Sequence, residues 1–125
     1  MLLWAAEHHG VQFQGITLLP HQHANVSLLI EQNDLQGRRQ IHLQDYCDLQ
    51  AGKRLHRIAS NGMCEHCGMA NLDGYFAQLR QVLQPGGLLI NHSITTGSVH
   101  SNPLGPGLSE FIEAHILPGE ELARA

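Results

Sequence analysis

The stretch that decides the fold is NLDGYFAQLRQVLQPGGLLINH, residues 71–92. Its pattern predicts a helix from Asn71, the expected N-terminal cap, to about Gln84. The apolar residues of this helix are expected on one face: Leu72, Phe76, Leu79 and Val82/Leu83. Pro85-Gly86-Gly87 predicts a turn, and Leu88–His92 predicts a strand that opens with three apolar residues.

The elements before this stretch follow the same alternation of helix and strand. We expect, in order, a helix at Leu2–His9 ended by Gly10, a strand at Val11–Leu18, a helix at about His21–Gln36 ended by Gly37, and strands at Gln40–Tyr46 and Leu55–Ser60. After the last strand we expect a polar loop at Gly97–Gly107 and a short element at Phe111–Leu117. This order predicts one α/β domain with a mostly parallel sheet.

The composition narrows the class of function. The chain has 125 residues, a formal net charge of −4 and only seven Lys plus Arg, so it lacks the basic surface that nucleic acids require. No apolar run approaches the roughly 20 residues of a transmembrane helix, and the N-terminus lacks the pattern of a signal peptide. Three cysteines in such a chain are expected to be reduced thiols, so we expect a cytoplasmic protein.

Candidate site residues lie at the carboxyl ends of the predicted strands, where ligands of parallel α/β sheets bind. The four places are Thr17-Leu18, Asp45-Tyr46, Ser60 through His66, and His92-Ser93-Ile94. We therefore expect the functional site at the carboxyl ends of the strands.

The segment Cys64-Glu65-His66-Cys67 permits two kinds of chemistry. A small metal-binding or redox module could use Cys64, Cys67 and His66 with Cys47, although a structural zinc site needs four ligands and only one Cys-x-x-Cys pair is present. The thiols could equally be small apolar residues packed in a turn. Glu65 must face solvent or hold a partner, because burying an unpaired carboxylate is costly. Both interpretations stay open on these residues alone.

Longer stretches resemble the cyclopropane-fatty-acyl-phospholipid synthases and the mycolic acid cyclopropane synthases. The stretches are GVQFQGITLLPHQ (10–22), LQDYCDL (43–49), HRIASNGMCEHCG (56–68), YFAQLRQVLQPGGLLINHSIT (75–95) and FIEAHILPGEEL (111–122). The resemblance implies a Rossmann-like class I methyltransferase sheet, with residues 1–125 forming part of an S-adenosylmethionine-dependent methyltransferase domain. It also implies methylene or methyl transfer to the cis double bond of unsaturated phospholipid acyl chains, at the inner membrane surface.

The resemblance also implies residue roles. Cofactor-binding positions are Thr17, Leu18, Gln22, Asp45, Tyr46, Ser60, Gly62 and His66. The catalytic positions, which in the family hold a bicarbonate that acts as general base, are Glu65, His92 and the backbone of Ile94. No metal is implied.

The chain departs from the family pattern at several positions. His56 replaces an Asp, Asn61 an aliphatic residue, and the three cysteines replace Arg, aromatic and aliphatic residues. The glycine-rich loop, the first strand, the C-terminal strands and two further bicarbonate-site residues are expected outside these 125 residues. The predicted strands at Val11–Leu18 and Leu55–Ser60 are then not neighbours, since the first strand lies between them.

We expect an interior segment that is unstable alone and binds S-adenosylmethionine weakly or not at all, which calorimetry would test. An inactive remnant of the methyltransferase is the third alternative. The sequence does not determine the product, the lipid headgroup or the oligomeric state.

Overall fold

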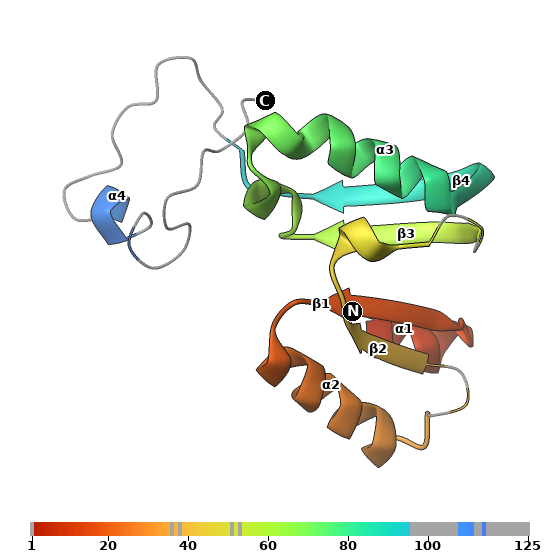
Figure 1. The fold of residues 1–125 in the computed structure, drawn as a ribbon. Coiled ribbons are helices and arrows are strands. Elements are labelled where there is room, and N and C mark those ends of the chain that lie inside the picture. Colours follow the sequence, from red (N-terminus) through yellow and green to blue (C-terminus); the bar gives the residue numbers. More distant parts are fainter. Residues whose placement is uncertain are drawn as a thin grey trace. The chain divides into compact units, whose positions relative to one another are not determined.

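The computed structural model describes residues 2–35, 37, 39–50, 52, 54–95, 108–111 and 114. The chain divides into two compact units, Met1–Leu49 and Gln50–Ala125 (Figure 1). Each unit contains one pair of parallel strands with a helix between them in the sequence. Two parallel strands need a crossover connection, so each unit is a strand-helix-strand motif.

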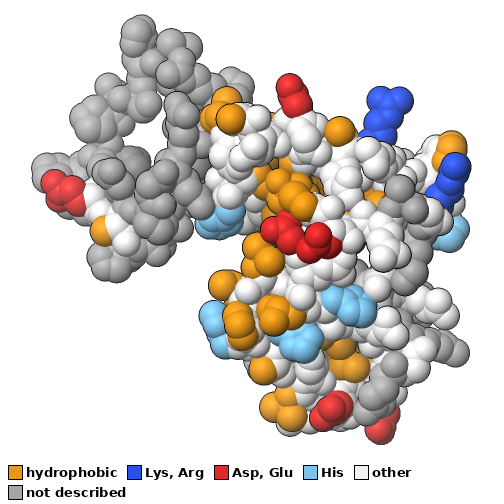
Figure 2. Space-filling model, viewed as in Figure 1, with side chains coloured by type: hydrophobic (Ala, Val, Ile, Leu, Met, Phe, Trp, Pro, Cys, Tyr) orange, Lys and Arg blue, Asp and Glu red, His pale blue; other side chains and the backbone are white. Residues whose placement is uncertain are grey.

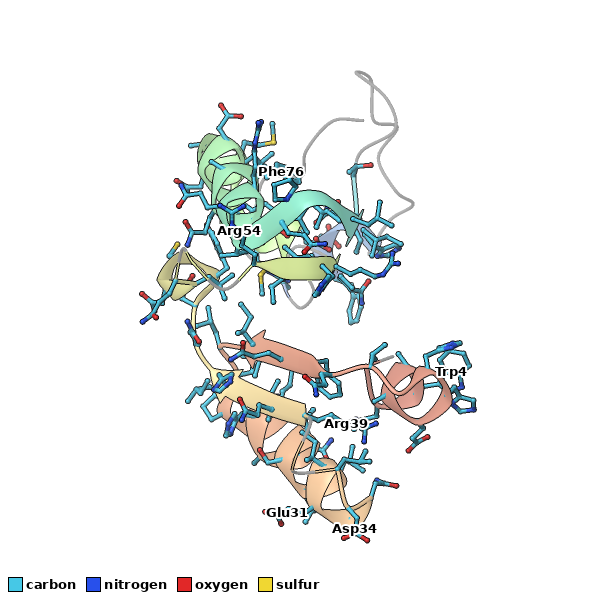
Figure 3. All side chains as sticks on the ribbon, turned by 90° about the vertical axis from the view of Figure 1, so that its right-hand side faces the viewer. Trp4, Glu31, Asp34, Arg39, Arg54 and Phe76 are labelled. Atoms are coloured by element: carbon cyan, nitrogen blue, oxygen red, sulfur yellow. The ribbon has the colours of Figure 1, made fainter. Side chains whose placement is uncertain are left out.

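The first unit begins with α1 (Leu2–His9). The helix ends before Gly10 as predicted, and the Gly10 N–H donates to the carbonyl oxygen of Ala6 at 3.1 Å. Trp4 projects from α1, stacked on His8 with a ring-centroid distance of 4.4 Å (Figure 3). Ala6 is buried on this helix.

The strand pair of this unit is β1 (Phe13–Thr17) and β2 (Arg39–Leu43), joined through α2 (Pro20–Gln32). α2 packs against both strands (Figure 1). Its buried residue is Ile30, four residues before Asp34 ends the local helical geometry. The core of this unit is therefore small.

The predicted helix at His21–Gln36 was too long at its end. α2 ends at Gln32, and Asp34 has a φ of +53°, in the left-handed region that stops a helix. The Asn33 side chain donates to the carbonyl oxygen of Leu29 at 2.7 Å, which satisfies one of the free carbonyls at the helix end. Side-chain hydrogen bonding thus ends the helix before Gly37.

The predicted strand at Gln40–Tyr46 was also too long. β2 ends at Leu43, and the Asp45 carboxylate caps a 3₁₀ helix, η1 (Tyr46–Asp48), by accepting from the Cys47 N–H at 2.8 Å. An Asp side chain competes with strand pairing in this way. Asp45 and Tyr46 therefore lie just beyond the strand.

The second unit contains β3 (Leu55–Asn61) and β4 (Leu83–His92), which pair in parallel. Between them are two short 3₁₀ helices, η2 (Cys64–Cys67) and η3 (Met69–Asn71), and then α3 (Leu72–Val82), which packs against β4 (Figure 1). α4 (Leu108–Phe111) follows. The loop predicted at Gly97–Gly107 lies outside the described residues, and of the element predicted at Phe111–Leu117 only Phe111 and Ala114 are described.

The buried face of α3 differs from the predicted one. Tyr75, Leu79 and Val82 are buried, whereas Phe76 is 41% exposed. Tyr75, Leu79 and Val82 are spaced by four and three residues, so they form one helix face with Tyr75 in place of Phe76. Periodicity alone did not separate the two adjacent aromatic residues.

Asn71 occupies the predicted position before α3 but does not cap it. Its side-chain amide donates backward to the carbonyl oxygen of Cys67 at 2.8 Å. The amide group therefore stabilises the turn that contains η3 and leaves the first turn of α3 without a side-chain cap.

β4 starts earlier than predicted and includes the expected turn. It runs from Leu83, with an irregular register that leaves Arg57 paired with Leu88. Successive strand residues point to opposite faces of a sheet, so Leu88 and Ile90 of β4 lie on the face opposite Asn91. Leu88 is 59% exposed and Ile90 is 66% exposed. One face of this strand pair is therefore covered by α3 and the other remains open within its unit.

The two strand pairs are separate sheets in the part of the chain that the structure describes. The predicted α/β class with parallel strands is confirmed. Among the described helices, none combines the length and the apolar character needed to cross a membrane.

Candidate functional site

The first group of predicted site residues lies at the carboxyl ends of β1 and β2. Thr17 is the last residue of β1, and its carbonyl oxygen accepts from the Gln44 N–H at 3.0 Å. This bond extends the strand pairing by one residue, and Asp45 and Tyr46 follow directly. The ends of the two strands are therefore held together where the sequence predicts a ligand.

Thr17 and Gln22 are brought into direct contact. The Thr17 hydroxyl accepts from the Leu19 N–H at 3.2 Å and donates to Oε1 of Gln22, in the first turn of α2, at 3.0 Å. The side chain of Thr17 thus organises the turn from β1 into α2. The Gln22 amide nitrogen keeps its donor capacity for a further partner.

Leu18, between these two residues, is 61% exposed, and Leu43 at the end of β2 is 54% exposed. Figure 2 shows apolar and histidine side chains interspersed on the visible face of this unit. Tyr46 is partly exposed, and Asp45 uses Oδ1 for the Cys47 N–H. This end of the unit offers apolar surface, an aromatic ring and a carboxylate.

The second group lies at the carboxyl ends of β3 and β4. The Gly62 N–H donates to the carbonyl oxygen of His92 at 2.9 Å, one residue beyond the last strand pair, Asn61 with His92. The two chains then separate, one into η2 and one toward Ile94. This bond joins the two segments that carry the predicted catalytic positions.

Glu65 connects the same two segments through its side chain. Its Oε1 accepts from the Ile94 N–H at 3.3 Å, and the residue is only 6% exposed. The other carboxylate oxygen, Oε2, is buried and has no hydrogen-bond partner among the described residues. Buried polar atoms are normally hydrogen-bonded, to protein groups, ordered water or a ligand, so Oε2 has the capacity for one further partner.

The two histidines of this group present exposed side chains. His66 donates its backbone N–H to the carbonyl oxygen of Met63 at 3.1 Å within the η2 segment. His92 contributes its carbonyl oxygen to the bond with Gly62, and its imidazole is exposed at the end of β4. The structure thus brings Glu65 and Ile94 into contact through a side chain, and His92 to Gly62 through the backbone.

The hydroxyl of Ser60 points toward α3. It lies 2.6 Å from the Tyr75 hydroxyl, which is also 3.0 Å from Oδ1 of Asn91. Tyr75 is completely buried. Burial raises the pKa of Tyr75, the hydrogen bond from Ser60 opposes this effect, and the nearby Cys64, Cys67 and Glu65 add to it.

The hydrogen bond between Tyr75 and Asn91 was missed in the sequence. A usable signal was present at Asn91, because a polar residue within an apolar strand needs a hydrogen-bond partner. Its partner is on α3, 16 residues away in the chain, and no local pattern identifies it.

The cysteine pair has a different environment from the one a metal centre needs. Cys64 is buried, and the Cys67 thiol donates to the carbonyl oxygen of Met63 at 3.3 Å. Within the residues described, no group of three or more His, Cys, Asp or Glu side chains is placed to hold a metal ion. The two cysteines flank Glu65, whose open oxygen is the more distinctive feature of the segment.

The sequence of this chain is similar to those of several known proteins. A "Probable fatty acid methyltransferase" of Pseudomonas putida is 34% identical over 119 residues, which cover 95% of this chain and 30% of that protein. The "Cyclopropane-fatty-acyl-phospholipid synthase" of Escherichia coli K12 is 32% identical over 109 residues, covering 87% of this chain and 27% of that protein. The chain therefore spans about a third of the length of these relatives.

Two solved structures share the fold over 98% of this chain and 45% of their own. The cyclopropane synthase MmaA2 from Mycobacterium tuberculosis superposes with a TM-score of 0.82 at 27% identity. The mycolic acid cyclopropane synthase CmaA1, complexed with SAH and CTAB, superposes with a TM-score of 0.80 at 25% identity. The family model described as mycolic acid cyclopropane synthetase matches residues 1–125. The chain belongs to the mycolic acid cyclopropane synthetase family.

Proposed function

We propose that this chain forms part of an S-adenosylmethionine-dependent enzyme that transfers a methyl or methylene group to the cis double bond of unsaturated phospholipid acyl chains. The observation that carries this proposal is the buried Glu65 carboxylate, held by the Ile94 N–H through one oxygen and open at the other. Family membership supports the reaction class. The phospholipid substrate is supported by the name of the E. coli relative.

In the first unit, the cofactor-binding part of the proposal rests on the carboxyl ends of β1 and β2. S-adenosylmethionine, when bound, supplies an electrophilic methyl group on a sulfonium. Thr17, Leu18 and Gln22 would hold its ribose and methionine side, and the Tyr46 ring and the Asp45 carboxylate would hold its adenine. An aromatic face suits a planar base, and a carboxylate accepts from an exocyclic amine. The SAH in the CmaA1 structure supports a cofactor of this class.

In the second unit, the proposed cofactor-binding residues are Ser60, Gly62 and His66. The His66 side chain is exposed, and Gly62 allows close approach of the backbone. Ser60 would contribute through its backbone, since its hydroxyl is directed to Tyr75.

Conversion of a double bond and one added carbon into a ring requires the loss of a proton. A bicarbonate at Glu65, His92 and Ile94 would supply the base for this step. The residues fit such an anion, because Oε2 of Glu65 lacks a partner and a protonated bicarbonate oxygen can donate to it. Glu65 would thereby orient the bicarbonate through a hydrogen bond. The Ile94 N–H in turn orients the Glu65 carboxylate by donating to Oε1.

The substrate implies work at a membrane surface, and we propose a peripheral location on the inner side. The exposed Leu18 and Leu43 provide apolar surface at the carboxyl ends of β1 and β2, where an acyl chain or cofactor would be received.

A chimera tests the proposed function. The segment of the E. coli synthase that this chain matches is replaced by this chain, in cells without their own synthase, and cyclopropane fatty acids are measured by gas chromatography. We expect product from the chimera and a loss of roughly 10²–10⁴-fold for Glu65→Gln, which removes a group that orients a base. Glu7→Gln makes the same chemical change at an exposed position of α1 and should leave the product unchanged.

Two results would count against the proposal. A folded chimera that binds no S-adenosylmethionine would refute the reaction class. An active chimera that keeps full activity with Glu65→Gln would refute the role of Glu65.

A further inference from the structure

The completely buried hydroxyl group of Tyr75 joins the two strands of the second unit. It lies 2.6 Å from Oγ of Ser60 on β3 and 3.0 Å from Oδ1 of Asn91 on β4. A phenol has one proton and can both donate and accept, so it can donate to Asn91 while it accepts from Ser60. Tyr75 thus links α3 to both strands through one oxygen atom.

The position of this link along the strands relates it to the candidate site. Ser60 and Asn91 are direct partners in the strand register. One further pair, Asn61 with His92, separates them from the bond between Gly62 and His92. The Tyr75 link therefore precedes the point where the two chains diverge.

Beyond that point, the two chains are joined again by the bond from the Ile94 N–H to Glu65 at 3.3 Å. This distance is slightly longer than is usual for an N–H···O bond, and the geometry of the bond depends on how the two segments leave the strands. Glu65 lies five residues after Ser60, and Ile94 lies three residues after Asn91. A change in the spacing of the strands at Tyr75 should therefore alter the distance between Glu65 and Ile94.

We propose that Tyr75 is a positioning residue, whose hydroxyl holds the ends of β3 and β4 at the spacing that lets Glu65 accept from Ile94. The consequence of this positioning is the placement of Oε2 of Glu65, and its importance rests on the proposed function. The hydrogen-bond geometry itself is independent of that function. Phe at this position would keep the aromatic packing, including the edge-to-face contact with Phe76 at 5.0 Å, and would lose the hydroxyl that forms the link.

The alternative is that Tyr75 stabilises the unit merely as a core residue. The two roles differ in where the protein loosens when the hydroxyl is removed. A positioning role predicts local opening at Gly62 and Ile94, whereas a core role predicts uniform loosening of all protected amides in the unit.

Amide hydrogen exchange, read residue by residue in the folded chimera described above, separates these outcomes. For Tyr75→Phe we expect exchange at the Gly62 and Ile94 amides to accelerate roughly tenfold more than at the amides of α3, the change expected when a hydrogen bond is lost. The control is Val82→Ala, which weakens the packing of the same helix face at a residue that is 2% exposed. It should accelerate exchange evenly through the unit.

A second variant covers the event that Tyr75→Phe fails to fold. Asn91→Leu removes the acceptor on β4 and keeps an apolar strand residue, and it should release the same two amides. Even acceleration in both Tyr75→Phe and Asn91→Leu, or no acceleration at Gly62 and Ile94, would overturn the proposal. Because exchange needs no cofactor or lipid, its result stands even when the chimera described above proves inactive.

Discussion

Glu65 is the residue whose environment is best explained by function. One of its oxygens is hydrogen-bonded to the Ile94 N–H, and the other is buried without a partner among the described residues. Such an arrangement costs stability, and costs of this kind concentrate at functional sites. The same segment contains Cys64 and Cys67, which the sequence made equally prominent.

Two substitutions of Glu65 should distinguish how its two carboxylate oxygens contribute to the free energy of unfolding. Glu65→Gln keeps an acceptor for Ile94 and removes the carboxyl group, so we expect the free energy of unfolding to stay unchanged or to rise by about 1 kcal/mol. Glu65→Ala removes the acceptor as well and should lower that free energy by about 1–3 kcal/mol relative to Glu65→Gln. Urea unfolding measures both; equal losses in the two variants would contradict this account.

Tyr75 should make the protein sensitive to alkaline pH. Burial raises its pKa above the ordinary value of 10.0, with smaller contributions from Cys64, Cys67 and Glu65, and the folded state then holds the phenol proton more tightly than the unfolded state. The contribution to stability is complete below about pH 10 and is lost as the pH rises from there through the folded-state pKa.

Urea unfolding as a function of pH tests this sign. We expect the free energy of unfolding to fall above about pH 10, and to fall less in Tyr75→Phe, which has no phenol to ionise. The other titrating groups are common to both proteins and cancel in the comparison. Parallel pH profiles for the two proteins would show that Tyr75 does not contribute.

At the scale of elements, the turn between η2 and α3 depends on a backbone conformation that few residues adopt. Gly68 has φ +74° and ψ 148° and separates η2 from η3. A side chain is strained in this region regardless of the space around it. The turn places Cys67 and Glu65 on one side and the start of α3 on the other.

Two glycine substitutions should therefore have opposite effects. Gly68→Ala should lower the free energy of unfolding by about 1–3 kcal/mol through backbone strain. Gly74→Ala lies within α3, where an added Cβ meets no atom within 4 Å, and should raise it by about 0.4–1 kcal/mol. Thermal or urea unfolding measures the two variants side by side, and a destabilised Gly74→Ala would be inconsistent with the described packing of α3.

At the scale of the whole molecule, one face of the β3–β4 pair carries exposed apolar side chains among the described residues of its unit. Leu88 and Ile90 lie on it at 59% and 66% exposure, opposite the face covered by α3. Parallel strands are normally covered on both faces. Exposed apolar surface of this kind promotes association.

We expect the 125-residue chain to self-associate through this face. Ile90→Thr keeps a residue suited to strands and makes the face more polar, so it should shift sedimentation toward monomer. Ala77→Ser, at an exposed position of α3, is the control and should leave the distribution unchanged. A wild-type chain that sediments only as monomer would contradict this prediction.

The sequence by itself determined the order of the elements and the α/β class. It did so because hydrophobic periodicity and turn residues act over a few neighbouring positions, as at Gly10 and in the stretch from Leu72 to His92. It also placed Thr17, Asp45 and Glu65 at or just beyond the carboxyl ends of strands. The wrongly predicted boundaries lie where a local conformation or hydrogen bond ends an element early. Asp34 adopts a left-handed conformation just after α2, and Asp45 caps η1 just after β2.

Only the tertiary structure decided which groups meet. The bond between Glu65 and Ile94 spans 29 residues, and the link from Tyr75 to Ser60 spans 15. It also selected Tyr75 over Phe76 for the buried face of α3. The physical reason is that a buried polar group forms its hydrogen bond with a group that tertiary packing places nearby. The packing of the helix on the strands determines that partner, and no local sequence pattern does.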